Sequence, residues 1–319
     1  MSRLTGRQLR GLRRLLGVAV VAVLLVVVFE RMGGSASSTP AAGHPAPTPT
    51  GSVPSPGADD RLRGLPQGAR VPEALVAPSP ADSPSAVPFT GLMPQVGALF
   101  SLDSNGQPSR HFCTGSVVDS PKGDVIATAA HCVIDPGGGQ QAGSKGAFDF
   151  VPGYHDGQSP YGLWAPVEVL VDPRWSGGGN PDYDIAFVVL RQVRPGAPGQ
   201  SGRSLQALVG ADPIGFGSAD AEPGVVGAIG YPVSADRPIA CLNATRPYNP
   251  NQSEFDCGGF ENGSSGGPLL RGISPDTGTG TLVGVIGGYQ EGGDSADVSY
   301  AAHLGPDIEA LYRRAVAVS

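Results

Sequence analysis

Three short segments carry a histidine, an aspartate and a serine in settings that suit nucleophilic catalysis. His131 lies in TAAHC, Asp184 opens the apolar run DIAFVVL, and Ser265 lies in GSSGGPL. A serine hydroxyl is a weak nucleophile at neutral pH and needs a base such as imidazole within hydrogen-bond reach. A buried carboxylate fixes the imidazole tautomer and stabilises its protonated form. We therefore predict a catalytic triad of His131, Asp184 and Ser265.

The glycines around the serine predict a second part of the site. A tetrahedral intermediate carries an oxyanion, and the backbone N–H groups of Gly263 and Ser265 are the expected donors to it. A flexible loop is the simpler interpretation of the run GSSGG, but Pro268 and apolar residues follow directly and favour a strand. Asp182 competes with Asp184 as the acid, and we prefer Asp184 because it directly opens the apolar run.

The elements that must position these residues are short strands. Apolar stretches of four to seven residues, bounded by Gly, Pro, Asp or Asn, recur through the C-terminal two thirds of the chain, which predicts an all-β barrel or sandwich. Residues 306–318 carry Ile308, Leu311 and Val316 at roughly helical spacing and predict a terminal helix. The expected strands cover residues 96–102, 115–118, 125–128, 167–171, 185–190, 225–229 and 282–286.

The N-terminal part predicts export from the cytoplasm. A cluster of arginines precedes an apolar run over residues 15–29, which suits a signal peptide or a short membrane anchor. Glu30, Arg31 and Met32 separate this run from the small residues a signal peptidase needs, so we favour a retained anchor over a cleaved, secreted form. We assign residues 1–32 to the signal or anchor segment, 33–88 to a disordered Pro/Ser/Ala-rich linker and 89–319 to the catalytic domain.

Composition excludes several classes of function. The formal net charge is −7 and charged residues make up 15% of the chain, so no basic excess suggests binding to nucleic acid. The sequence has no His-Glu-x-x-His and no Cys-x-x-Cys pair, so we expect neither a metal site nor a cofactor. We expect a monomer whose partners are a protein or peptide substrate and, through the N-terminal segment, the membrane.

Beyond these motifs, residues 89–319 resemble the chymotrypsin/trypsin-like serine peptidases, and among them the bacterial secreted branch. Besides the triad segments, the resemblance rests on HFCTGS at 111–116, GYP at 230–232 and GVIG at 284–287. It implies two six-stranded antiparallel β-barrels with the active site between them, followed by the C-terminal α-helix. The family motif Gly-x-Ser-Gly-Gly-Pro also favours Ser265 over Ser264 as the nucleophile. In the family the pair that corresponds to Cys113 and Cys132 is bridged, which leaves Cys241 with Cys257.

Specificity is less well defined by the resemblance. Counting back from Ser265 places Gly259 near the floor of the primary pocket, where no acid would attract a basic side chain. Gly287 and Tyr289 fall in the stretch that lines the cleft, and Tyr289 would narrow the pocket mouth. We expect a preference for small or apolar side chains, although Glu261 and Asp256 are nearby acids that would change this if they faced the pocket.

These features predict an extracytoplasmic serine endopeptidase that works through an acyl-enzyme. The alternatives are a catalytically silent, membrane-tethered binding domain on the same fold and an esterase using the same triad. In many animal relatives a new N-terminus folds inward and pairs with an aspartate just before the nucleophile. Here that position is the uncharged Ser264, and residues 89–94 lack the Ile-Val-Gly-Gly start. We therefore expect the domain to be competent without cleavage at a defined N-terminus.

Overall fold

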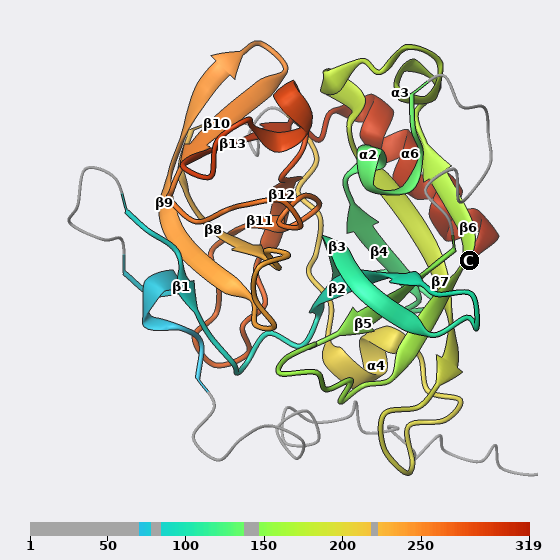
Figure 1. Cartoon of the computed structure of the whole chain (residues 1–319). Helices are drawn as coiled ribbons and strands as arrows, with labels where there is room; N and C mark the ends of the chain where they lie inside the picture. The colour runs from blue at the N-terminus through green and yellow to red at the C-terminus, as the bar shows by residue number, and fades with distance from the viewer. Residues whose placement is uncertain (1–69, 78–83, 137–146, 218–222) are drawn as a thin grey trace, which may run out of the picture. The chain divides into compact units, whose positions relative to one another are not determined.

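The computed structural model describes residues 70–77, 84–136, 147–217 and 223–319, all within the unit that spans residues 53–319. The expected signal or anchor segment and most of the expected linker lie outside these ranges. Within them, no helix is long and apolar enough to cross a membrane. The described chain is mostly β, with two curled sheets and a C-terminal helix (Figure 1).

The first sheet closes into a barrel in the strand order β2-β3-β4-β7-β6-β5, with antiparallel neighbours throughout. The shortest of these strands, β4, is wholly buried, and the first five residues of β7 are buried beside it. Both are rich in β-branched and other apolar residues, which suit a pleated core. The strands are β2 (Val96–Leu102), β3 (Pro108–Val117), β4 (Val125–Thr128), β5 (Phe148–Pro152), β6 (Leu163–Val171) and β7 (Ala186–Arg194).

The second sheet follows the order β12-β11-β8-β9-β10-β13 and also curls back on itself. Just past β12, the Gly287 N–H donates to the Tyr300 carbonyl of β13 at 2.9 Å and joins the two ends of the sheet. A seventh strand, β1, pairs with β9 at one side. The strands are β1 (Val87–Pro88), β8 (Val225–Gly230), β9 (Ile239–Asn249), β10 (Gln252–Asp256), β11 (Pro268–Arg271), β12 (Thr281–Val285) and β13 (Val298–Ala302).

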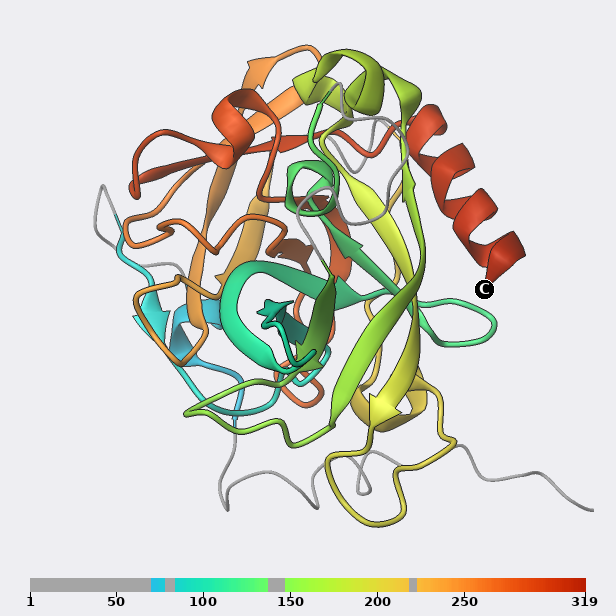
Figure 2. The ribbon, with the colours of Figure 1, turned by 45° about the vertical axis from the view of Figure 1, so that its right-hand side comes forward.

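The C-terminal helix α6 (Pro306–Val318) returns to the first barrel and packs on β6 and β7, as Figures 1 and 2 show. Its bounds match the prediction. Ile308, Leu311 and Ala315 form its buried face, whereas Val316 is only half-buried. The buried face thus turns slightly from the one expected, because a period of 3.6 residues places 315 rather than 316 beneath 308 and 311.

Short helical turns, which the strand pattern did not predict, connect the strands. Three of them have a side-chain cap: Asp172 caps α3, Asn180 caps η2 and Ser204 caps α4 through side-chain oxygens that accept a backbone N–H. These turns are α2 (Ala130–Val133), α3 (Pro173–Gly178) and α4 (Leu205–Val209), with 3-10 helices η1 (Glu73–Leu75), η2 (Pro181–Tyr183) and η3 (Tyr289–Gly292).

Two parts of the segment expected as linker lie against the second sheet. Val71 and Leu75 are buried, and Leu75 packs where the absent side chain of Gly227 leaves room on β8. Residues 84–89, which we call the N-terminal arm, contain β1 and run along β9. The arm is coloured cyan beside β9 in Figure 1.

Candidate active site

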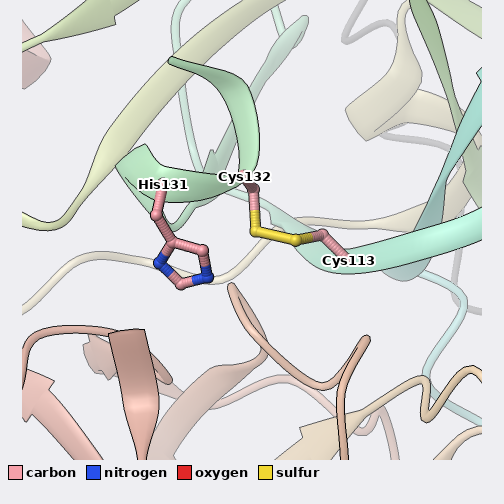
Figure 3. A group of neighbouring side chains, drawn as sticks. All are labelled: Cys113, His131 and Cys132. Atoms are coloured by element: carbon pink, nitrogen blue, oxygen red, sulfur yellow. A yellow bond between two sulfur atoms is a disulfide. The ribbon is translucent and has the colours of Figure 1, made fainter. Parts of the chain in front are cut away.

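His131 is held at the start of the short connection after β4. It lies in α2, and the residue is only 5% exposed. The Trp175 indole from α3 donates to the Ile134 carbonyl at 3.0 Å and fixes the end of this turn. Cys132 is bridged to Cys113 on β3, so the residue next to His131 is tied to the neighbouring strand (Figure 3).

Asp184 meets His131 with both carboxylate oxygens. Its Oδ2 lies 2.7 Å from the imidazole Nδ1, and its Oδ1 accepts the His131 backbone N–H at 2.9 Å. The Gly288 N–H donates to the same Oδ2 at 2.9 Å, and Asp184 is fully buried. Asp182 instead accepts from the side chains of Asn251 and Gln252. Of the two candidate acids, Asp184 is therefore the one in contact with the histidine.

Ser265 and Ser264 face different environments. Ser265 is half-buried and lines a cleft, and its carbonyl accepts the Thr114 N–H at 2.8 Å from β3. Ser264 is 1% exposed, and its hydroxyl has no hydrogen-bond partner in the described chain. The Ser264 side chain packs against Gly230, where a Cβ would lie only 2.7 Å from it. Only Ser265 of the pair is placed to meet a substrate.

The cleft that contains Ser265 also contains His131. One wall comes from β2, β3 and α2, and the other comes from the loop between β10 and β11 together with Glu291 of η3. The Ser265 hydroxyl lies 3.5 Å from the Glu291 carbonyl, at the long limit of a hydrogen bond. Gln290 and Glu291 both have positive φ, 51° and 53°, which is rare for residues other than glycine. The lining residues are Ser101, Phe112, Cys113, His131, Cys132, Asn262, Gly263, Ser265 and Glu291.

The residues expected at the primary pocket are not among those lining this cleft. Gly287 lies against Asp184, since a Cβ there would be 3.1 Å from its Oδ2. The Tyr289 ring packs in a tilted contact with Tyr248 and edge-to-face with Tyr300 on the surface of the second sheet. Gly259 lies beneath the N-terminal arm, with Ala86 of the arm as its neighbour.

The two acids considered as alternative pocket residues are occupied elsewhere. Glu261 accepts from the Ser234 hydroxyl, and Asp256 pairs with Arg246.

Sequence reasoning did not identify Glu291 or Gly288 as parts of the site. Both act through backbone atoms, which residue type does not reveal; the one signal was the glycine doublet Gly287 and Gly288.

The two predicted oxyanion donors are the backbone N–H groups of Gly263 and Ser265. Within the described chain, neither the Gly263 nor the Ser265 amide donates to a protein acceptor. The Gly263 carbonyl is held by the Thr114 hydroxyl at 2.9 Å, and Gly263 has a φ of 96°. A Cβ at this position would lie 2.5 Å from the Tyr231 carbonyl, so the turn requires glycine. The arrangement leaves two N–H groups available to stabilise negative charge.

Disulfides join both predicted cysteine pairs, Cys113–Cys132 and Cys241–Cys257. Cys113, His131 and Cys132 also bring three potential metal-ligand atoms within 4.8 Å of one another. Figure 3 shows that the two sulfur atoms are bonded to each other. Metal sites use the deprotonated thiolate, so this group does not form a donor set for a metal.

Comparisons with known proteins show the family and the fold. The Trypsin family model matches residues 94–302. The structure of protease Anisep from Arthrobacter nicotinovorans is similar at a TM-score of 0.58 and 27% identity, covering 72% of this chain and 98% of that one. The thermostable serine protease AL20 from an extremophilic microorganism is similar at 0.58 and 27%, covering 71% and 99%. A Glu endopeptidase at 15% identity and a TM-score of 0.55 shares the fold.

A search of curated proteins finds no match. The family model nevertheless spans most of the chain. The alignments with the two proteases at 27% identity cover those proteins almost completely. The chain belongs to the trypsin family and has the fold of the chymotrypsin-like serine proteases.

Proposed function

We propose that the protein is an extracytoplasmic serine endopeptidase that cleaves peptide bonds with Ser265, His131 and Asp184. The observation that carries the proposal is the 2.7 Å contact between His131 Nδ1 and Asp184 Oδ2 beside a cleft that also contains Ser265. A buried carboxylate on Nδ1 leaves Nε2 as the base that faces the cleft. A silent binding domain would not need this pairing.

The reaction begins when the Ser265 hydroxyl turns from the Glu291 carbonyl toward His131 Nε2. Its proton passes to the imidazole as Oγ attacks the peptide carbonyl, and the Gly263 and Ser265 N–H groups stabilise the oxyanion. His131 then protonates the leaving amine, which leaves an acyl group on Ser265. Water, activated by the same imidazole, hydrolyses the acyl-enzyme and restores the serine.

Two disulfides support a location outside the cytoplasm. Disulfides persist in oxidising compartments and are rare in reducing ones. The arginine-flanked apolar run in residues 15–29 supports export, with either a retained anchor or a cleaved signal. The substrate is then a protein or peptide outside the cytoplasm.

Digestion of an unfolded protein tests this function. We expect the full chain to cleave reduced, alkylated casein into discrete peptides, and Ser265→Ala to leave the casein intact. Matched peptide amide and ester substrates separate a peptidase from an esterase, because an esterase would hydrolyse only the ester. No turnover of either substrate by the oxidised wild-type protein would contradict the proposal and favour a silent binding domain.

A further inference from the structure

The N-terminal arm is hydrogen-bonded to the loop that leads to the nucleophile. The Ala86 N–H donates to the Gly258 carbonyl at 2.7 Å, and the Gly258 N–H donates to the Pro84 carbonyl at 2.8 Å. On its other side the arm pairs with β9, with Val87 opposite Ala240. The arm therefore lies as an added strand between β9 and the segment around Gly258.

Two glycines of the loop lie next to the arm. A Cβ at Gly258 would lie 3.3 Å from the Ser85 hydroxyl, and a Cβ at Gly259 would lie 3.6 Å from the Ala86 methyl group. Gly259 also has a φ of 103°, a region that side-chain-bearing residues rarely adopt. The loop thus contributes backbone but no side chain of its own at this point, and the arm supplies the packing.

Backbone hydrogen bonds continue from these glycines to the nucleophile. The Glu261 N–H donates to the Gly259 carbonyl at 2.9 Å, and the Ser264 N–H donates to the Glu261 carbonyl at 3.0 Å. Gly263 and Ser265 lie on either side of Ser264 in the same loop. These two hydrogen bonds connect the glycines beside the arm to Ser264, and Thr114 of β3 holds the Gly263 and Ser265 carbonyls from the other side.

We propose that the N-terminal arm is a positioning element of the active site, which holds residues 258–265 in the conformation that presents the oxyanion donors and Ser265. This inference rests on the proposed function. The buried Ser264 has no charge with which to hold this loop, and its hydroxyl has no partner in the described part of the chain. A strand contributed by the chain just upstream of the catalytic domain holds the loop without a free N-terminus.

Two proline substitutions in the full chain test the proposal. Ala86→Pro removes the N–H that holds Gly258. The control is Ser104→Pro, far from the arm in sequence: Ser104 is exposed at the second position of the turn from Asp103 to Gly106, where proline is favoured, and its N–H has no backbone acceptor in the described ranges. We expect Ala86→Pro to lower the rate of fluorophosphonate labelling at Ser265, and kcat/KM for casein, at least tenfold per folded molecule. Ser104→Pro should stay within about twofold of wild type. Equal rates for two folded variants would overturn the proposal.

Hydrogen exchange gives a measurement that does not depend on turnover. In Ala86→Pro the Gly258 and Ser264 amides should exchange at least tenfold faster, with β4 and β7 amides unchanged; unchanged Ser264 exchange would overturn the positioning role. The wild-type protein could fail to react with the fluorophosphonate while Ala86→Pro still speeds exchange of the Gly258 and Ser264 amides. That result would reject the proposed function and keep the positioning role of the arm. If Ala86→Pro does not fold, Ala86→Gly removes only the methyl group against Gly259 and should slow labelling about threefold. A rate equal to that of Ser104→Pro would count against the proposal.

Discussion

The Asp184 carboxylate holds His131 at two points, the imidazole Nδ1 at 2.7 Å and the backbone N–H at 2.9 Å. One residue thus fixes both the orientation of the ring and the turn that carries it. The Gly288 N–H reaches the same carboxylate from the far end of the second sheet. Asp184 therefore links His131, which follows β4 of the first barrel, to Gly288, which follows β12 of the second sheet.

Asp184→Asn should reduce kcat by about 10³- to 10⁴-fold, because an amide on Nδ1 favours the wrong imidazole tautomer. Steady-state hydrolysis of a fluorogenic peptide measures the loss. Asp182→Asn is the matched control, since Asp182 contacts Asn251 and Gln252 rather than His131, and it should retain activity within about threefold. Similar losses in both variants would contradict the assignment of Asp184.

Gly263→Ala should lower kcat by about 10²- to 10³-fold by displacing one oxyanion donor. The cause is steric, because the added Cβ would lie 2.5 Å from the Tyr231 carbonyl. Gly272→Ala is the control: its φ is also positive, at 63°, but no atom lies within 4 Å of the added Cβ. We expect that variant to lose about 1 kcal/mol of stability and no activity. Full activity in Gly263→Ala would argue against an oxyanion role for this turn.

The Cys113→Ala/Cys132→Ala double variant should lose about 3 kcal/mol of unfolding free energy, since the bridge closes a loop with a sequence separation of 19. It should also lower kcat, because Cys132 is adjacent to His131. The Cys241→Ala/Cys257→Ala variant, with a separation of 16, should lose similar stability and retain more of its activity per folded molecule. Urea unfolding and active-site titration measure the two effects. An equal loss of kcat from both would show that the first bridge has no particular effect on His131.

Asp212 should make stability depend on pH. This carboxyl is fully buried, accepts the Gly280 N–H at 3.0 Å, and has a pKa that burial raises to about 7. Because its folded-state pKa exceeds the ordinary value of about 3.8, its stabilising contribution is full below pH 4 and is lost as pH rises toward 7. Asp212→Asn should remove this dependence on pH. The unfolding free energy that wild type loses through Asp212 between pH 4 and pH 7 should be about 2 to 4 kcal/mol. Urea unfolding of both proteins between pH 4 and 8 measures it, and identical slopes would contradict the prediction.

Apolar runs predicted several of the buried elements, although they missed β5, whose five residues are all buried. Residues 125–128, 96–102 and 306–318 coincide with β4, β2 and α6. β10 was missed because its sequence, QSEFD, has one large apolar residue, Phe255; it is held by backbone pairing with β9 and β13. The N-terminal arm was missed for a similar reason, since its proline- and serine-rich sequence forms a strand only against the exposed edge of β9.

Residue type alone was enough to identify the site residues that make contacts through their side chains. His131 and Asp184 could be proposed because imidazole and carboxylate have few other uses in such motifs. The Gly288 amide and the Glu291 carbonyl act through backbone atoms, so their roles depend on the path of η3. That path includes positive φ at Gln290 and Glu291, which no sequence pattern specifies.

Mass-spectrometric mapping of a fluorophosphonate adduct tests the central claim most directly, because the probe reacts only with an activated serine. We predict one adduct per chain, on Ser265, in the wild-type protein. Ser264→Ala should be labelled and Ser265→Ala should not. An adduct on Ser264, or labelling that persists in Ser265→Ala, would contradict the account.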